Sequence, residues 1–277
     1  LQPFQFCNLS EVVVREDDKE EELLDKVEAA TILGTMQATL TNFKYLRRQW
    51  KDATEKERLL GVSLTGIMDH KILSGDVFNE AILPDLLKRL KQKAVNVNKL
   101  WAKRFGINQA TAITCVKPSG TVSQLVNAAS GIHARHNEHY IRRVRGDKKD
   151  PLTKFLQSQN IPTEDCVMKP DATAVFSFVE KAPNGCITRN ERSALEQLNH
   201  WLVYAKYWCE HKPSITISVN DNEWLGVADW CWNNFDDLSG VSFLPNFGHV
   251  YQQAPYEDID KDGFNKLKKN QPNKINW

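Results

Sequence analysis

Short apolar runs alternate with longer amphipathic segments along the chain. Runs rich in β-branched and small apolar residues are typical of buried strands. We predict strands within residues 5–15, beginning just after Cys7 and Asn8, and within residues 58–68, 110–116, 174–179, 214–219 and 240–244. Apolar residues three and four positions apart indicate helices. These helices are predicted over residues 23–50, 83–105, 151–159, 190–209 and 222–233, with a basic helix near the end of the chain.

The order of these elements indicates the fold class. Strands that alternate with helices of crossover length predict parallel βαβ units and therefore an α/β fold. The sequence contains no repeat, no low-complexity segment and no convincing linker. A single domain is therefore expected over residues 1–277.

Composition narrows the possible classes of protein. The 277 residues are 41% hydrophobic and 26% charged, and 36 Lys and Arg against 35 Asp and Glu give a net charge of +1. That balance argues against bulk binding of nucleic acid or membrane. The sequence has no apolar run of membrane-spanning length and begins with neither Met nor a signal-peptide pattern. We therefore expect a fragment of a cytoplasmic protein.

The cysteines and histidines do not predict a metal site. Six cysteines are scattered without a C-x-x-C pair, which argues against structural zinc and against a disulfide scaffold. His133, His136 and His139 are three residues apart, but the preceding Gly131 favours a loop with ordinary histidines. We expect no metal ion to be bound by this stretch.

Lys117–Val126, with the sequence KPSGTVSQLV, carries the clearest sign of ligand binding. It follows the predicted strand at 110–116 and leads into an apolar-periodic segment near Ser123, which indicates a strand, a loop and a helix. Gly120 would let a ligand approach the backbone, and the free N–H groups of a first helical turn attract phosphate. A plain turn with a serine cap and no ligand is the alternative that this pattern leaves open.

Several stretches together resemble the C-terminal half of the catalytic subunit of class II ribonucleotide reductases, the monomeric type that depends on adenosylcobalamin. They are FCNLSEVVVR (6–15), KPSGTVSQLV (117–126), GIHARH (131–136), YIRRVRGDKKDPL (140–152), AVFSF (174–178), HKPSITISV (211–219) and SGVSFLP with QAPYE (239–257). Their order and spacing cover nearly the whole chain, which makes the resemblance specific.

The resemblance implies the second half of a ten-stranded α/β barrel, with parallel strands and crossover helices. In this family a finger loop carries the cysteine that becomes a thiyl radical, in an Asn-x-Cys-x-Glu motif ahead of the strand at Cys7. Residues 1–277 are therefore expected to lack the N-terminal half, the finger loop and the C-terminal cysteine tail. Cys7 resembles one of the two cysteines that reduce the ribose 2′ position and become a disulfide. A buried core cysteine is the alternative.

The resemblance also implies a substrate site and a cofactor. The loop that holds the substrate phosphates corresponds to Ser119, Gly120, Thr121, Val122 and Ser123. The stretch 242–257 has no adjacent tyrosine pair, which fits radical generation from adenosylcobalamin. The absence of an Asp-x-His-x-x-Gly motif indicates a base-on cofactor. An external dithiol such as thioredoxin is the expected reductant.

The implied function is a part in an oxidoreductase that converts ribonucleoside triphosphates to deoxyribonucleotides for DNA synthesis in the cytoplasm. The loop sequence leaves a diphosphate substrate open. Expected partners are the nucleotide, the missing N-terminal half and a thioredoxin-like reductant, without membrane or nucleic acid. A non-redox nucleotide-binding α/β module and an inactive half-barrel are the alternatives.

Overall fold

The structure is a computed structural model that describes residues 3–76, 79–246, 251–272 and 274–276. The chain folds into two compact units. Unit 1 comprises residues 1–134, 185–187 and 191–246, and unit 2 comprises residues 135–184, 188–190 and 247–277. Unit 1 has two sheets and unit 2 has one, and each unit has its own buried cluster. The single domain expected over residues 1–277 stays a prediction.

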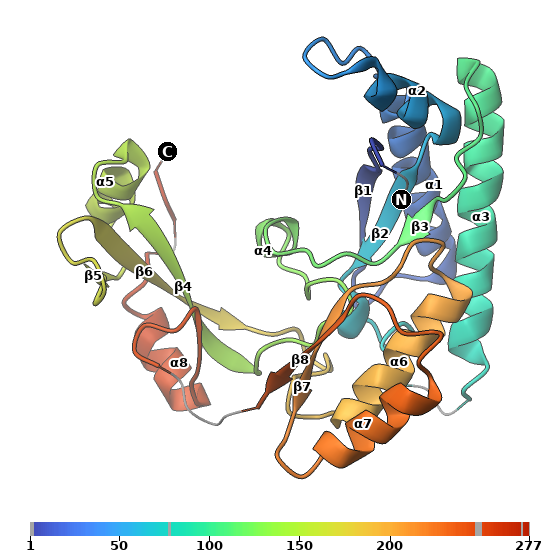
Figure 1. Ribbon diagram of the computed structural model, residues 1–277. Coiled ribbons are helices and arrows are strands. Elements are labelled where there is room, and N and C mark those ends of the chain that lie inside the picture. The colour runs from blue at the N-terminus through green and yellow to red at the C-terminus, as the bar shows by residue number, and fades with distance from the viewer. Residues whose placement is uncertain (1–2, 77–78, 247–250, 273, 277) are drawn as a thin grey trace. The chain divides into compact units, whose positions relative to one another are not determined.

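Unit 1 is an α/β unit with two parallel sheets. β1 (Asn8–Val13), β2 (Leu60–Thr65) and β3 (Thr114–Cys115) form one sheet, and β7 (Ile215–Val219) and β8 (Val241–Pro245) form the other. Its helices are α1 (Glu20–Gln37), α2 (Arg48–Glu57), α3 (Ile82–Phe105), α4 (Val122–Leu125), α6 (Ala194–Tyr207) and α7 (Trp224–Asn233), with a 3-10 turn η1 (Ile67–Asp69). Helices α1, α3 and α6 lie on one side of the strands, and the loop that carries α4 lies on the other (Figure 1).

The core of unit 1 lies between its strands and its outer helices. β2 is buried along its whole length, because β1 and β3 pair with its two edges and α1 packs against it. α3 contributes Leu86, Leu87 and Leu90 at the helical spacing that the sequence predicts. Trp201 of α6 is fully buried and donates from its indole N–H to the Pro213 carbonyl at 3.1 Å. The outer helices are therefore fixed to the sheet by apolar burial.

His200 of α6 is a buried histidine of this unit. Burial, together with the charge of Arg192, lowers the pKa of His200 to about 3. Its ring meets the ring of Tyr204 edge-on, with centroids 5.1 Å apart. The imidazole is therefore neutral across the physiological range.

Acid is expected to destabilise the chain partly through His200. An unfolded histidine binds a proton near pH 6.5, whereas the folded side chain binds one only near pH 3. The unfolded state thus takes up the proton first, and stability falls as the pH drops through this window, by about 2 kcal/mol between pH 7 and pH 5. Urea unfolding at both pH values measures the effect, and His200→Leu should remove it. A variant as sensitive to pH as the wild type would contradict the assignment.

The helix predicted over residues 23–50 is wrong in its extent. α1 ends at Gln37, and α2 begins only at Arg48. Thr39 donates its hydroxyl to the Met36 carbonyl at 2.7 Å. Because threonine hydroxyls compete in this way for the helical backbone, the Thr-Leu-Thr-Asn stretch at 39–42 favours a helix end over continuation.

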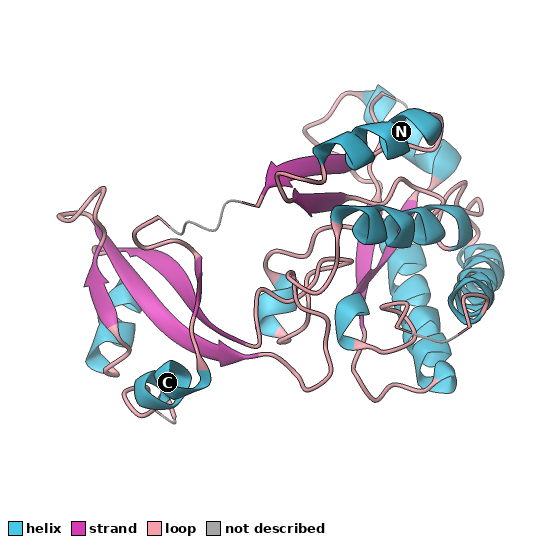
Figure 2. Cartoon of the chain, turned by 90° about the horizontal axis from the view of Figure 1, so that it is seen from below, coloured by secondary structure: helices cyan, strands magenta, loops and turns pink. Residues whose placement is uncertain are grey.

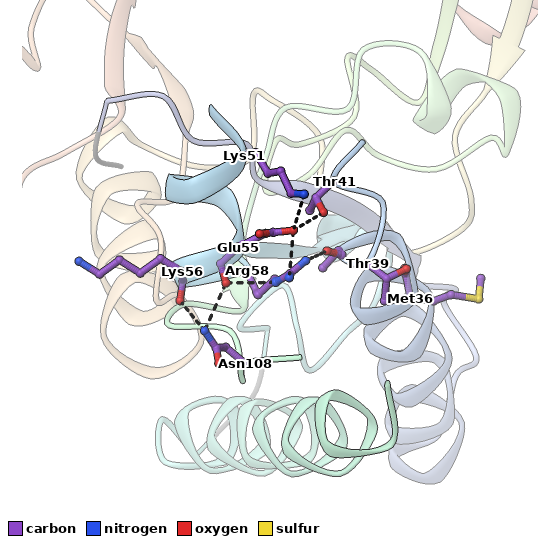
Figure 3. A network of polar contacts seen from close by, with 9 residues as sticks. Met36, Thr39, Thr41, Lys51, Glu55, Lys56, Arg58 and Asn108 are labelled. Atoms are coloured by element: carbon purple, nitrogen blue, oxygen red, sulfur yellow. Dashed lines mark hydrogen bonds and ion pairs between the residues drawn. The ribbon is translucent and has the colours of Figure 1, made fainter. Parts of the chain in front are cut away.

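Polar contacts centred on Glu55 hold the segment between these two helices (Figure 3). Thr41 donates to Glu55 Oε1 at 2.6 Å, and Arg58 pairs with the same oxygen at 3.7 Å. Arg58 also donates to the Ala38 carbonyl at 2.6 Å, and Asn108 donates to the Glu55 carbonyl at 3.3 Å. α2 is thereby joined to the end of α1 and to the loop after α3.

Unit 2 contains a four-stranded antiparallel sheet in the order β5-β6-β4-β9. Its strands are β4 (His139–Asp147), β5 (Thr163–Asp165), β6 (Thr173–Lys181) and β9 (Tyr256–Asp258), and its helices are α5 (Pro151–Ser158) and α8 (Lys261–Lys268). β4 and β6 pair along their whole length and form the long magenta ribbons of this unit (Figure 2). Ala174 and Phe176 of β6 belong to the small buried cluster of this unit. In the described part of the chain, no helix is both long and apolar enough to cross a membrane.

The expected parallel arrangement is confirmed in unit 1 and wrong for residues 174–179. This strand belongs to β6, which runs antiparallel to β4 and β5. The link between β5 and β6, residues 166–172, is too short for a parallel crossover, which needs about a dozen residues. Residues 240–244 are also not the last strand, because β9 follows them. Residues 247–250, within the stretch 239–257 that carries part of the resemblance, lie outside the described residues.

Candidate active site

Cys7 lies immediately before β1, where two contacts fix the chain. Asn8 donates its backbone N–H to the Leu59 carbonyl at 2.9 Å, and on the other side the ring of Phe6 stacks on Trp50 with centroids 4.8 Å apart. The thiol is partly buried, and that burial raises its pKa, while the positive charge of Lys117 lowers it. Cys7 is therefore a positioned thiol with a cation nearby.

Gly61 of β2 has no side chain, and this leaves space beside the Cys7 sulfur. A Cβ at this position would lie 3.0 Å from Cys7 Sγ and 3.3 Å from Cys115 Sγ. Cys115, in β3, is fully buried, and burial together with the neighbouring Cys7 raises its pKa to about 12. Two thiols thus lie on the same face of the sheet, and Cys115 stays protonated.

Serine side chains shape the loop that follows β3. Ser119 Oγ donates to Glu11 Oε2 at 2.9 Å and accepts from the Ser123 N–H at 3.0 Å. Ser119 also donates its N–H to Ser130 Oγ at 3.0 Å. Ser123 is fully buried, and its hydroxyl donates to the Ser119 carbonyl. These hydroxyls therefore hold the loop in shape.

Gly120, Thr121 and Val122 form the exposed crest of this loop. Within the described residues, no acceptor lies within hydrogen-bond distance of their three backbone N–H groups. α4 is only four residues long, shorter than the helix that the sequence predicts. Its dipole adds little, so the capacity to bind an anion rests on consecutive free N–H groups.

A cavity of about 400 Å³ opens beside the crest. Residues of β1, β2 and the loop line it: Leu9, Ser10, Glu11, Ser63, Lys117, Pro118, Ser119, Gly120, Thr121 and Val122. This volume is typical of sites for small molecules. Burial raises the pKa of Glu11, and the hydrogen bond from Ser119 lowers it. Because Lys117 lines the cavity and also acts on Cys7, it connects the cavity electrostatically to the thiol.

The chain after α4 packs tightly against the start of the loop. Gly131 has a φ of +55°, and a Cβ there would lie 2.6 Å from the Lys117 carbonyl oxygen, so only glycine fits without strain. Thr65 Oγ1 donates to the Ala129 carbonyl and accepts from the Gly131 N–H, both at 2.9 Å. Thr65 therefore fixes the return of the loop to the end of β2.

Thr65→Val is expected to lower the free energy of unfolding by about 1–3 kcal/mol, because a buried carbonyl and a buried N–H lose their partner. Urea unfolding of the chain measures this change. Thr39→Val is the matched control, since it removes one exposed hydroxyl bond and should cost no more than about 0.5 kcal/mol. An equally small effect at both positions would contradict the role given to Thr65.

The histidines between 133 and 139 have separate partners. His133 donates from Nδ1 to the Ser130 carbonyl at 2.9 Å and accepts at Nε2 from the Thr216 N–H at 2.9 Å. In unit 2, His136 Nε2 lies 2.9 Å from an oxygen of Asp258. In the described parts of both units, no three His, Cys, Asp or Glu side chains are grouped so that they could hold a metal ion.

The structure brings the predicted site residues into one unit, together with residues that the sequence did not single out. Ser119 to Ser123 form the loop, and Cys7 lies on the sheet that the loop follows. Glu11, Ser63 and His211 were missed because their partners are distant in sequence; the Cys7 and His211 contact spans 204 positions. Lys117 belongs to the predicted loop sequence but was given no role, although its position two residues before Ser119 could have indicated that it lies close to the site.

No protein-family model matches the chain. Its fold matches the crystal structure of a B12-dependent, class II ribonucleotide reductase with a TM-score of 0.84 and 25% identity, over 99% of this chain and 41% of that one. The class Id alpha subunit of Actinobacillus ureae shares the fold with a TM-score of 0.57 and 14% identity, over 86% of this chain and 49% of that one. The fold is that of part of a class II ribonucleotide reductase, and the predicted α/β fold class is confirmed.

Curated proteins of one class of ribonucleotide reductase are similar to the chain. The adenosylcobalamin-dependent ribonucleoside-triphosphate reductases of Lactobacillus delbrueckii subsp. bulgaricus and Euglena gracilis are each 28% identical to the chain, over 94% and 95% of its length. A probable enzyme of the same name from Dictyostelium discoideum is 28% identical over 96% of the chain. The chain spans 38%, 36% and 35% of the lengths of these three relatives. The resemblance found in the sequence motifs is confirmed: nearly the whole chain is similar to part of the class II reductases.

Proposed function

We propose that this chain is part of an adenosylcobalamin-dependent reductase that converts ribonucleoside triphosphates to deoxyribonucleotides for DNA synthesis. One observation carries the proposal. A positioned thiol at Cys7 and an exposed row of backbone N–H groups at 120–122 occur together in unit 1, in a chain that aligns over 94% of its length with reductases of that name.

Cys7 is the proposed redox-active cysteine of this reductase. In that role it contributes one of two sulfurs that reduce the ribose 2′ position, and it forms a disulfide with a cysteine outside residues 1–277. The partial burial of the thiol and its contact with the sheet support a fixed position for the sulfur. An external dithiol such as thioredoxin is the proposed reductant of that disulfide, in the cytoplasm.

Ser119, Gly120, Thr121, Val122 and Ser123 are the proposed site for the substrate phosphates. The exposed N–H groups of Gly120, Thr121 and Val122 support this role, because an anion gains about 1.5–3 kcal/mol from each charge-assisted hydrogen bond. Ser119 and Ser123 serve the site indirectly, since their hydroxyls hold the loop. The cavity beside the crest gives the rest of a nucleotide room to enter.

Adenosylcobalamin, proposed here in its base-on form, supplies the radical chemistry when bound. The residues of this chain act on the substrate side of the reaction: they hold phosphate and position a thiol.

The test combines residues 1–277 with the part of the reductase that has no counterpart in this chain, in one polypeptide or as a second chain. Ribonucleoside triphosphate, adenosylcobalamin and a dithiol are added, and deoxynucleotide is measured by chromatography. We expect product that requires all three additions, with diphosphate as the alternative substrate. Failure to form product from either substrate while nucleotide is still bound would overturn the proposal and favour a non-redox nucleotide-binding module.

A further inference from the structure

His211 lies in a segment whose backbone is held firmly against β3. This segment connects α6 to β7, and the N–H groups of Glu210 and His211 both donate to the Thr114 carbonyl, at 2.9 and 3.0 Å. Three residues later, Ser214 donates its N–H to the Val116 carbonyl at 3.0 Å. The position of His211 is thus set by the sheet and not by its own side chain.

The ring of His211 is oriented by β2. Its Nε2 lies 2.7 Å from the Leu60 carbonyl oxygen. A carbonyl can only accept a hydrogen bond, so Nε2 carries a proton. The same Nε2 lies 3.9 Å from Cys7 Sγ, which is within reach of the weaker, longer hydrogen bond that sulfur accepts. The N–H group is therefore shared between a backbone oxygen and the sulfur.

Within the described residues, three segments bring charged or titratable groups close to Cys7. Lys117 supplies positive charge from the loop after β3, Cys115 of β3 is a thiol kept neutral by burial, and His211 supplies the N–H. Burial lowers the pKa of His211, and the charge of Lys117 acts in the same direction, whereas the backbone carbonyls of Leu60 and Ala112 raise the pKa. At neutral pH the ring is a neutral donor, so its effect on the sulfur comes from a hydrogen bond and not from a full charge.

We propose that His211 is a positioning residue that donates a hydrogen bond from Nε2–H to the Cys7 sulfur and stabilises it as the thiolate. This inference rests on the proposed redox role of Cys7. When the disulfide of Cys7 is reduced, a thiolate of the external dithiol attacks the partner sulfur and Cys7 leaves as a thiolate, so a donor that stabilises this thiolate speeds the return of Cys7 to its reduced state. Ionisation moves the thiol proton to solvent, and the imidazole keeps its own proton.

The test measures the ionisation of Cys7 directly in the 277-residue chain. Alkylation by iodoacetamide is followed from pH 6 to about 11.5, and the peptide that contains Cys7 is quantified by mass spectrometry. In His211→Phe the midpoint for Cys7 should rise by about one pH unit, which is about a tenfold slower reaction at pH 7. His211→Gln, which keeps an N–H donor, should restore part of the loss.

Cys231 of α7 is the internal control in the same samples, because it lies outside the site. Its alkylation rate should be equal in all three proteins. An unchanged Cys7 midpoint in His211→Phe would overturn the proposal. An equal increase in the alkylation rates of Cys7 and Cys231 in His211→Phe would also overturn the proposal, because that result would report loss of the fold.

A second measurement needs no histidine variant. In wild-type chain with ¹⁵N-labelled histidine, the Nε2 resonance of His211 should shift with the same midpoint as Cys7 alkylation, and Cys7→Ala should abolish this shift. Absence of any shift across that midpoint would overturn the proposal. These readouts are separate from turnover: if Cys7 ionises as expected but proves dispensable for deoxynucleotide formation, the proposed function fails and the contact stands.

Discussion

Cys7→Ser is expected to abolish deoxynucleotide formation by the complete reductase while nucleotide binding is kept. A serine oxygen is close in size to sulfur, so the packing before β1 is retained, but it cannot alternate between a thiol and a disulfide. Turnover should fall by at least about a thousandfold, as for other groups that take part in bond making. Product formation with dithiol present, and equilibrium dialysis of nucleotide, measure the two properties.

Cys231→Ser is the matched control for this experiment. Cys231 lies in α7, is partly buried like Cys7, and has no place in the proposed site. Its replacement should leave turnover within about twofold of the wild type. Retained turnover in Cys7→Ser would exclude the redox role, and loss of both turnover and binding would indicate that Cys7 serves mainly to pack unit 1.

Gly61→Ala is expected to separate the stability of the chain from its activity. The added methyl group would lie 3.0 Å from Cys7 Sγ and 2.4 Å from the end of the Leu9 side chain. Leu9 is 53% exposed and can turn away, whereas the Cys7 sulfur must move off its place. Since a displacement of about 1 Å at a reacting group can cost a hundredfold in rate, turnover should fall by about 10- to 100-fold.

The stability of Gly61→Ala should change much less than its turnover. The close approach to the buried Cys115 costs free energy, but alanine also restricts the unfolded chain more than glycine does, so we expect a loss of no more than about 1 kcal/mol. Gly34→Ala is the control, because its Cβ would make only ordinary contacts of 3.6 Å or more in α1. A Gly61→Ala enzyme with normal turnover would show that the Cys7 sulfur is not held where the structure has it.

Periodicity in the sequence was enough to predict most helices and strands of unit 1. α3 was expected over 83–105 and spans Ile82–Phe105, because its apolar residues recur at helical spacing along its whole length. The break between α1 and α2 was missed because it depends on hydroxyl groups that end a helix locally, as Thr39 does. The antiparallel sheet was missed because strand direction depends on pairing partners such as β4 and β6, which no local pattern specifies.

The candidate site was predictable only in part. Cys7 and the loop at 119–123 were found because they lie in motifs whose residues are adjacent in sequence. Glu11, which accepts the Ser119 hydroxyl, sits 108 positions away from it, and the contact exists only once β1 and the loop are folded. The hydrogen bond from the Ser123 hydroxyl to the loop's own backbone could not be predicted either, because the sequence of a turn does not show whether its serine contacts a ligand or the backbone.

The placement of β2 between β1 and β3 limits how Cys7 can be oxidised. Neighbouring strands are about 4.8 Å apart, and Cys115 is level with Glu11 and not with Cys7, so the backbones at Cys7 and Cys115 are separated by more than about two such spacings. A disulfide requires Cα atoms within about 7 Å, so these two thiols cannot join while the sheet is intact. β2 separates the two cysteines, so the Cys7 sulfur can react with another partner but cannot bond to the buried thiol of Cys115. A partner that forms a disulfide with Cys7 must therefore come from outside this sheet. A disulfide between Cys7 and Cys115 could form only after the sheet has opened.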